Sequence, residues 1–418
     1  MNFDQLLSKR ISRMHANILR EILKNASIPG VISLAGGVPS PESFPMDIIA
    51  ALTARVLDTY GPSALQYGPT EGFPPLRESI VPFLRAKGII TTAGQVLVTS
   101  GSQGALDAIG KILLSEGDKV ALESPTYLGA ISAFNPYEPI YLKIDTDEDG
   151  PTPEGLEYLF SRHKIKFIYL VPTFQNPTGM TMPLSRRKEI AEFLVRENAL
   201  LIEDDPYSDL RYVGTPVPSI QTLAPDHVIY LGTFSKILSP GLRVGYCIVP
   251  ETLKKWMVIA KQGIDLHTSS LSQAIAFEYL NGGYANNHLP VILRYYRTRL
   301  LAMLDGLQSS FHGDFSWSKP EGGMFVWVEG PKNFDATRFY DKALKQGVAF
   351  VPGQYFHIGF DEGKATMRLN FTMHDAPEIK KALSVLGEMI HIECGVGVNH
   401  SRVVSRHADF SAYSLCSY

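Results

Sequence analysis

Short apolar runs alternate with amphipathic, helix-like segments through the middle of the chain. The runs are rich in Val, Ile and Leu and occupy residues 96–99, 119–122, 167–170, 200–203, 228–231 and 244–249. Apolar runs without polar alternation are typical of strands that are buried on both faces. With helical patterns between several of them, as at 186–198, they predict an α/β fold whose mostly parallel sheet carries helices on both faces.

The pattern changes near residue 286, where a long helix candidate at 289–307 leads into a mixture of strands and helices. We therefore expect a large domain at 46–285 and a smaller α+β domain at 286–393, preceded by an N-terminal arm at 1–45. Residues 394–418 are rich in Ser, Val and His and lack clear periodicity. This composition predicts a flexible tail.

Composition narrows the function classes. The chain of 418 residues has a net charge of −3, and this balance argues against nucleic acid or an anionic membrane as partner. It contains no uncharged apolar run near the roughly 18 residues that a membrane span needs, and its first residues do not resemble a signal peptide. Three cysteines make neither a disulfide framework nor a spaced metal site. We expect a cytoplasmic protein without a metal centre.

The candidate chemistry begins at Lys236, which follows the apolar run 228–231 and the hydroxyls of Thr233 and Ser235. Arg243 lies seven positions further on. A lysine amine can form a Schiff base with an aldehyde, and hydroxyls with a guanidinium can hold a phosphate. Pyridoxal 5′-phosphate (PLP) carries both groups, so this segment predicts a PLP anchor.

Two further strands end in polar groups. Ser102 and Gln103 begin a helix candidate after a small-residue turn, where free backbone N–H groups favour an anion; the same pattern also fits an ordinary strand-to-helix turn. Asp204 and Asp205 follow a strand at the edge where open α/β sheets bind ligands. A carboxylate there would keep a pyridine nitrogen protonated, although paired aspartates also cap helices.

Asn176 and Arg368 also have two interpretations each. Asn176 lies in an Asn-Pro turn after an apolar strand, and it either donates to the cofactor phenolate oxygen or only shapes the turn. Arg368 lies between apolar neighbours, and its planar fork matches a carboxylate. Alternatively, it forms a structural ion pair at a sheet edge.

Together and in this order, the motifs resemble those of the fold-type I PLP enzymes. The chain is similar to class I/II aminotransferases of the kynurenine/2-aminoadipate and aromatic or multi-substrate branch over about residues 15–393. The motifs lie at 33–37, 66–68, 100–103, 124–127, 176–179, 204–207, 233–236, 320–324, Arg243 and Arg368. The resemblance implies a mostly parallel seven-stranded sheet sandwiched by helices, with a smaller α+β domain.

The resemblance also implies roles around the cofactor ring. Lys236 resembles the Schiff-base lysine that later shuttles a proton. Asp204 resembles the carboxylate at the pyridine nitrogen, Asn176 and Tyr207 resemble the partners of the phenolate oxygen, and Tyr127 resembles the aromatic plate on the ring.

A second set of implied roles concerns the phosphate and the substrate. The implied phosphate ligands are Ser102, Gln103, Thr233, Ser235 and Arg243. Arg368 resembles the clamp for the substrate α-carboxylate, with Gly37 and Asn176 nearby. Tyr67 resembles a tyrosine that reaches the phosphate of the neighbouring subunit, which implies a homodimer with shared active sites. Arg20 aligns with a segment that covers the substrate, and an exposed helix arginine is the alternative.

The activity implied is ping-pong transfer of an amino group from an L-amino acid to a 2-oxo acid, with 2-oxoglutarate as the expected acceptor. Aromatic amino acids, kynurenine, 2-aminoadipate and branched-chain substrates all fit the branch. A PLP-dependent lyase or decarboxylase on the same fold is an alternative. A regulator-derived PLP-binding domain is disfavoured, because the family motifs begin by Ser33 and leave no room for an N-terminal winged helix.

Overall fold

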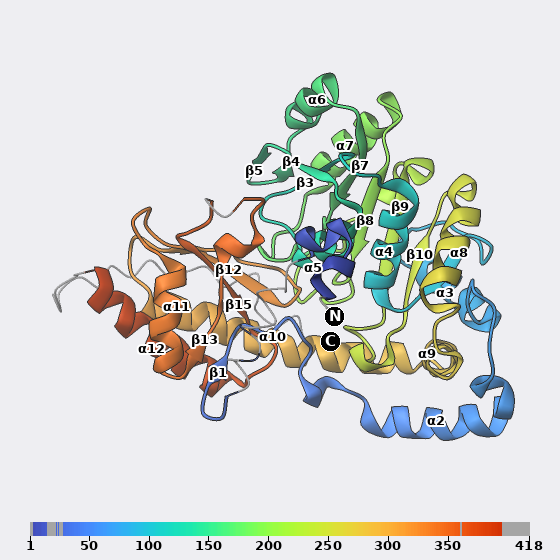
Figure 1. Ribbon diagram of the computed structural model, residues 1–418. Coiled ribbons are helices and arrows are strands. Elements are labelled where there is room, and N and C mark those ends of the chain that lie inside the picture. Colours follow the sequence, from blue (N-terminus) through green and yellow to red (C-terminus); the bar gives the residue numbers. More distant parts are fainter. Residues whose placement is uncertain (1–2, 15–21, 23, 25–27, 360–361, 395–418) are drawn as a thin grey trace.

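The computed structural model describes residues 3–14, 22, 24, 28–359 and 362–394 (Figure 1). Arg20 and residues 395–418 lie outside the described residues, so the structure does not bear on their predicted roles. Residue Cys394, which we assigned to the tail, ends helix α12 (Ala376–Cys394). No helix of the described residues is both long and apolar enough to cross a membrane.

A seven-stranded sheet forms the centre of the larger part, in the order β2-β10-β9-β8-β7-β3-β4. Only β10 pairs antiparallel with its neighbours, and the other pairs are parallel. The strands are β2 (Val96–Thr99), β3 (Lys119–Leu122), β4 (Ile140–Lys143), β7 (Ile165–Leu170), β8 (Leu201–Asp205), β9 (Val228–Thr233) and β10 (Gly245–Ile248). The predicted fold class is confirmed.

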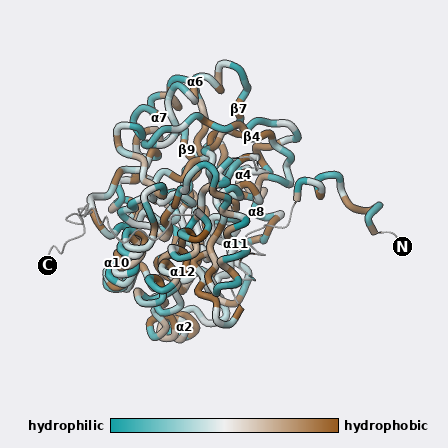
Figure 2. The backbone as a smooth tube through the Cα atoms, turned by 90° about the vertical axis from the view of Figure 1, so that its left-hand side faces the viewer, coloured by the Kyte–Doolittle hydropathy of each residue, from teal (hydrophilic) through white to brown (hydrophobic). Residues whose placement is uncertain are grey.

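Helices cover both faces of this sheet. They are α3 (Pro74–Arg85), α4 (Gly101–Leu113), α5 (Leu128–Phe134), α6 (Pro153–Arg162), α7 (Leu184–Arg196), α8 (Glu251–Asp265) and α9 (Ser270–Asn281), and α2 (Met46–Tyr60) packs on α9. Successive side chains of a strand point to opposite faces. Accordingly, Phe167 and Tyr169 of β7 pack with α4 and α5, whereas Ile168 and Leu170 pack with α6 and α7. Hydrophobic positions gather inside and hydrophilic ones follow the outer helices (Figure 2).

The C-terminal part contains a four-stranded antiparallel sheet in the order β11-β12-β15-β14. Its strands are β11 (Ser316–Trp317), β12 (Phe325–Glu329), β14 (Val351–Pro352) and β15 (Thr366–Asn370), and its helices are α10 (Tyr284–Ser310), α11 (Ala336–Lys345) and α12. Helix α10 runs along both parts of the molecule and through our expected boundary at 285/286 (Figure 1). The short strands β1 (Ile32–Ser33) and β13 (Val348–Ala349) pair in parallel and attach the N-terminal segment to this part.

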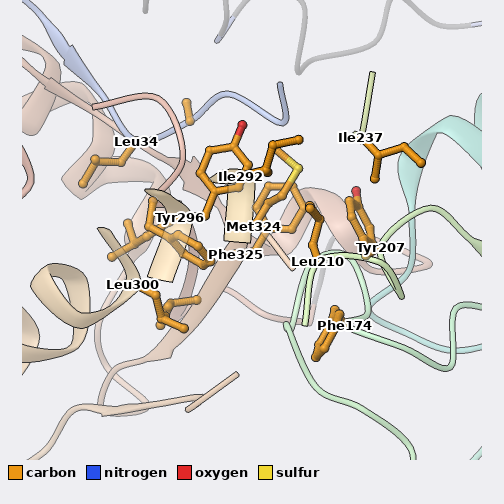
Figure 3. Packing of buried hydrophobic residues seen from close by; sticks show 14 of the residues in the cluster. Leu34, Phe174, Tyr207, Leu210, Ile237, Ile292, Tyr296, Leu300, Met324 and Phe325 are labelled. Atoms are coloured by element: carbon orange, nitrogen blue, oxygen red, sulfur yellow. The ribbon is translucent and has the colours of Figure 1, made fainter. Parts of the chain in front are cut away.

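The two parts share a hydrophobic core. Phe174, Tyr207 and Leu210 come from loops that follow the strands of the large sheet, and they belong to the same buried cluster as Met324 and Phe325 of the C-terminal part (Figure 3). This shared core holds the strand ends of the large sheet against β12 and β15, which is where the candidate site lies.

Candidate active site

One pocket of about 280 Å³ lies where β7, β8 and β9 end. Twelve of the residues we predicted for the site line it: Gly37, Ser102, Gln103, Tyr127, Asn176, Asp204, Tyr207, Thr233, Ser235, Lys236, Arg243 and Arg368. They are far apart in the sequence. Parallel strands bring most of them together because their carboxyl ends share one edge of the sheet, whereas Gly37 and Arg368 come from the N-terminal segment and from β15.

Lys236 follows β9 and projects its amine into this pocket. Its Nζ donates a hydrogen bond to the carbonyl oxygen of Gly37 at 3.2 Å and lies 6.0 Å from the ring centroid of Tyr207. Burial, helped by the positive charges of Arg243 and Arg368, lowers the pKa of the amine to about 8. A substantial share of the amine is therefore neutral near physiological pH, and the neutral form is the nucleophile.

Asp204 offers the pocket a free carboxylate oxygen. Its Oδ2 accepts a hydrogen bond from the hydroxyl of Tyr169 at 2.8 Å, whereas its buried Oδ1 has no partner in the protein. Both Asp204 and Asp205 belong to β8, so the helix-cap interpretation is wrong. Asp205 instead accepts hydrogen bonds from the Ser208 amide and the Tyr230 hydroxyl, which leaves Asp204 as the open acceptor.

The acidity of Asp204 makes a testable contribution to stability. Burial raises its pKa to about 7, whereas an aspartate in the unfolded chain has a pKa of about 4. The native state therefore binds an extra proton at Asp204, so the contribution of this group to the stability of cofactor-free protein should fall as the pH rises from about 4 to about 7. We expect Asp204→Asn to flatten this part of the profile of melting temperature against pH. Equal slopes for the two proteins would contradict the assignment.

Arg368 lies on β15 and reaches the pocket between two aromatic rings. Its guanidinium carbon is 4.2 Å from the ring centroid of Phe325 and 4.9 Å from that of Phe356. Nη1 donates to Asn176 Oδ1 and Nη2 donates to the Ala35 carbonyl, both at 2.8 Å. Its acceptors are neutral and its buried Nε has no partner. This arrangement does not match the structural ion pair that was the alternative, and it keeps the charge available to an anionic ligand.

Asn176 connects the guanidinium to the neighbouring phenol. Its Nδ2 donates to the Tyr207 hydroxyl at 3.4 Å while its Oδ1 accepts from Arg368. Burial raises the pKa of the Tyr207 hydroxyl above its usual value, so this phenol stays protonated. The amide and the phenol therefore both remain able to donate to a ligand oxygen.

The opposite end of the pocket is suited to an anion. Ser102 and Gln103 occupy the first turn of α4, where backbone N–H groups lack partners within the helix. Arg243 Nη2 donates to the Ser100 carbonyl at 3.1 Å, and a side chain at Gly101 would overlap this guanidinium. The Thr233 hydroxyl donates to Ser235 Oγ at 2.9 Å, which places two hydroxyls beside the same turn.

Tyr67 does not line the pocket of its own chain, and 78% of its surface is exposed. Tyr127 does line it, directly before α5. Burial, with the nearby charge of Asp204, raises the pKa of the Tyr127 hydroxyl to about 12. Its ring is therefore a neutral aromatic wall.

The family model for aminotransferases of class I and II matches residues 29–386. The chain belongs to this family. An aromatic-amino-acid aminotransferase 1 from Thermococcus litoralis is 42% identical over 400 residues, which cover 94% of this chain and 96% of that protein. A 2-aminoadipate transaminase from Thermus thermophilus is 40% identical, with 93% and 98% of the two chains covered. The solved structure of a Pyrococcus horikoshii kynurenine aminotransferase in complex with PMP is 43% identical, with a TM-score of 0.90 and 94% and 98% coverage.

The aminotransferase is PLP-dependent, and its pocket fits this cofactor. A nucleophilic amine, an open buried carboxylate oxygen and an anion-binding helix start are the partners that an aldehyde, a pyridine nitrogen and a phosphate require. The free Oδ1 of Asp204 supports this fit most directly, because an unpaired buried carboxylate oxygen is costly unless a ligand supplies its partner.

Several residues of this aminotransferase pocket were not predicted from the sequence. Apolar lining residues are Ala35, Val38, Val171, Pro206 and Pro240. Tyr169, which bonds Asp204, lies inside an apolar run and carries no sequence signal that distinguishes it from a core residue. Phe325 and Phe356 flank Arg368, and Phe325 could have been noticed because it directly follows the family motif at 320–324.

Proposed function

We propose that this aminotransferase moves the amino group of an aromatic, kynurenine, 2-aminoadipate or branched-chain L-amino acid to a 2-oxo acid, with 2-oxoglutarate as acceptor. One observation carries the proposal. The amine of Lys236, the free oxygen of Asp204 and the guanidinium of Arg368 line one pocket, and together they match the needs of a cofactor and an α-amino acid.

Bound PLP supplies an aldehyde that bonds amines and a ring that accepts an electron pair. Asp204 Oδ1 would accept a hydrogen bond from the protonated pyridine nitrogen, and Asn176 Nδ2 and the Tyr207 hydroxyl would donate hydrogen bonds to the phenolate oxygen. Tyr127 covers the ring face. The phosphate ligands are Ser102, Gln103, Thr233, Ser235 and Arg243.

Lys236 first holds the cofactor and then moves a proton. When its amine is not bonded to the cofactor, Nζ could take up the Cα proton of the substrate near neutral pH and release it again, because its pKa is lowered to about 8. Arg368 binds the α-carboxylate and thereby orients Cα toward Nζ, with Gly37 beside both groups. Arg20 remains our candidate for contact with the substrate side chain.

A panel of amino donors, measured in half-reactions and then with 2-oxoglutarate, tests the proposal. We expect each accepted donor to yield its 2-oxo acid in an amount equal to the amine form of the cofactor. Addition of 2-oxoglutarate should then restore the absorbance of the aldehyde form. Release of carbon dioxide or an elimination product without the amine form would instead support a lyase or decarboxylase.

We also infer a homodimer in which Tyr67 contacts the partner's bound phosphate. The exposure of Tyr67, at 78%, supports this inference, as does its edge-on contact with His267 at 5.7 Å between ring centroids. We expect light scattering to give twice the chain mass of 46.2 kDa, and Tyr67→Phe to weaken PLP binding by up to about tenfold. Tyr158→Phe, on the exposed surface of α6, is the control. A monomer with unchanged affinity in Tyr67→Phe would refute the inference.

The division into an arm at 1–45, a large domain at 46–285 and a small domain at 286–393 stays a prediction, as does the cytoplasmic location.

A further inference from the structure

A partly buried ion pair lies behind the end of the pocket that is suited to an anion. Lys261 and Asp265 are one turn apart on α8, which packs against α4 (Figure 1). Lys261 Nζ donates to Asp265 Oδ1 at 2.7 Å and to Oδ2 at 2.9 Å. The Lys261 side chain is only 4% exposed. Neither residue lines the pocket, so the proposed chemistry gives this pair no role.

The position of this ion pair does not stabilise helix α8 itself. Asp265 is the last residue of α8, where the helix dipole disfavours a carboxylate. A lysine that precedes the acid by four positions is also the weaker order for a helix ion pair. Burial moreover lowers the pKa of Lys261, because removing the charge from water is unfavourable. A contact outside α8 must therefore account for this pair.

That contact is Ser100, the N-cap residue of α4. Its hydroxyl donates to Asp265 Oδ2 at 2.5 Å and lies 3.2 Å from Thr268 Oγ1, which itself accepts from Lys261. An N-cap serine usually accepts hydrogen bonds from the N–H groups of the second or third helical residue. Ser100 makes no such bond, and those two residues are Ser102 and Gln103. Asp265 thus draws the capping hydroxyl away from the N–H groups that face the pocket.

The Ser100 main chain has a second connection. Its carbonyl accepts from Arg243 Nη2 at 3.1 Å, so one residue joins the ion pair, the start of α4 and the guanidinium. Fixing Ser100 from the α8 side therefore fixes both the helix start and the position of Arg243.

We propose that Lys261 and Asp265 are positioning residues for the cofactor phosphate. Lys261 orients Asp265, and Asp265 holds the Ser100 hydroxyl so that the N–H groups of Ser102 and Gln103 stay open to the phosphate. This inference rests on the proposed PLP function. It predicts that a released Ser100 hydroxyl competes with the phosphate for these N–H groups.

The test removes the ion pair without leaving a buried charge. In the Lys261→Met/Asp265→Leu variant, apolar side chains of similar length replace both partners, an exchange that often preserves stability. We expect its dissociation constant for PLP, measured by absorbance titration of cofactor-free protein, to rise by about tenfold, the effect of roughly one charge-assisted hydrogen bond. Adding Ser100→Ala removes the competing hydroxyl and should restore most of the affinity. Ser100→Ala alone should bind PLP nearly as the wild type does.

Binding of pyridoxal, which lacks the phosphate, distinguishes a loss of phosphate positioning from a general loss of structure in the pocket. We expect its affinity to be the same in the wild type and the Lys261→Met/Asp265→Leu variant. Tyr60→Phe is the matched control, because it removes the hydrogen bond to Glu278 of α9 at 3.0 Å and leaves Ser100 untouched. It should keep its PLP affinity.

Three results would overturn the inference: unchanged PLP affinity in the Lys261→Met/Asp265→Leu variant, no recovery on adding Ser100→Ala, or an equal loss for pyridoxal. Failure of the proposed function looks different, because the wild type would then neither bind PLP covalently nor complete the half-reaction.

Discussion

Lys236→Ala is expected to abolish covalent retention of the cofactor and to slow transamination on the order of 10⁴-fold. The variant loses the amine that bonds the aldehyde and also the group that moves the Cα proton. Lys236 is the lysine that lines the pocket, and burial lowers the pKa of its amine to about 8, as a nucleophile near neutral pH requires. PLP should still bind through its phosphate and ring, so the loss is one of covalent attachment.

Absorbance spectra before and after borohydride reduction, followed by peptide mapping, measure this outcome. Lys87→Ala is the matched control. Lys87 pairs with Asp209 at 2.6 Å and does not line this pocket, so its replacement should leave the spectrum intact. If the reduced cofactor were found on another lysine in Lys236→Ala, with turnover maintained, the anchor would be misassigned.

Arg368→Ala should lower kcat/KM for amino acids and oxo acids by about 30- to 5,000-fold while PLP remains bound, because removing one partner of a buried pair of opposite charges, here Arg368 and the substrate carboxylate, costs about 2–5 kcal/mol. Arg368 is 3% exposed and is held between two aromatic rings. Burial lowers its pKa to about 10, so it is still charged at neutral pH. A substrate carboxylate therefore meets a desolvated cation whose position is already fixed.

Arg368→Lys separates charge from geometry. Lysine keeps the positive charge but lacks the planar fork and its stacking on the rings, so we expect only partial recovery of kcat/KM. Substrate titrations of the half-reaction give the affinities, and the PLP spectrum reports whether the cofactor site is intact. Unchanged substrate affinity in Arg368→Ala would show that another group binds the carboxylate.

The residues that the sequence placed best are those at strand ends. Lys236, Asp204 and Asn176 each follow an apolar run, and parallel strands necessarily bring such positions to one edge. The fold class followed from the same runs. Strand β4 was not predicted, because it lies at the sheet edge with exposed and half-buried residues and therefore lacks a continuous apolar pattern.

Other features depend on tertiary contacts that no local pattern encodes. The direction of β10 is set by its antiparallel pairing with β2 and β9. Helix α10 begins at Tyr284, before our expected start at 289, and contains Pro290, which usually marks a helix start. The bond from Ser100 to Asp265 joins residues 165 positions apart, so their adjacency emerges only once α8 packs on α4.

The pairing of β1 with β13 has a consequence for how the enzyme is made. The Ala35 carbonyl that holds Arg368 lies 333 positions before it in the chain, just after a strand whose partner is β13. On the ribosome, at about 5–20 residues per second, the N-terminal segment must therefore wait unpaired until nearly the whole chain has emerged. Contacts of such long sequence separation form late and slowly. We expect nascent chains that stop short of β13 to leave this segment open to proteases and chaperones, and the substrate clamp to be among the last parts of the enzyme to assemble.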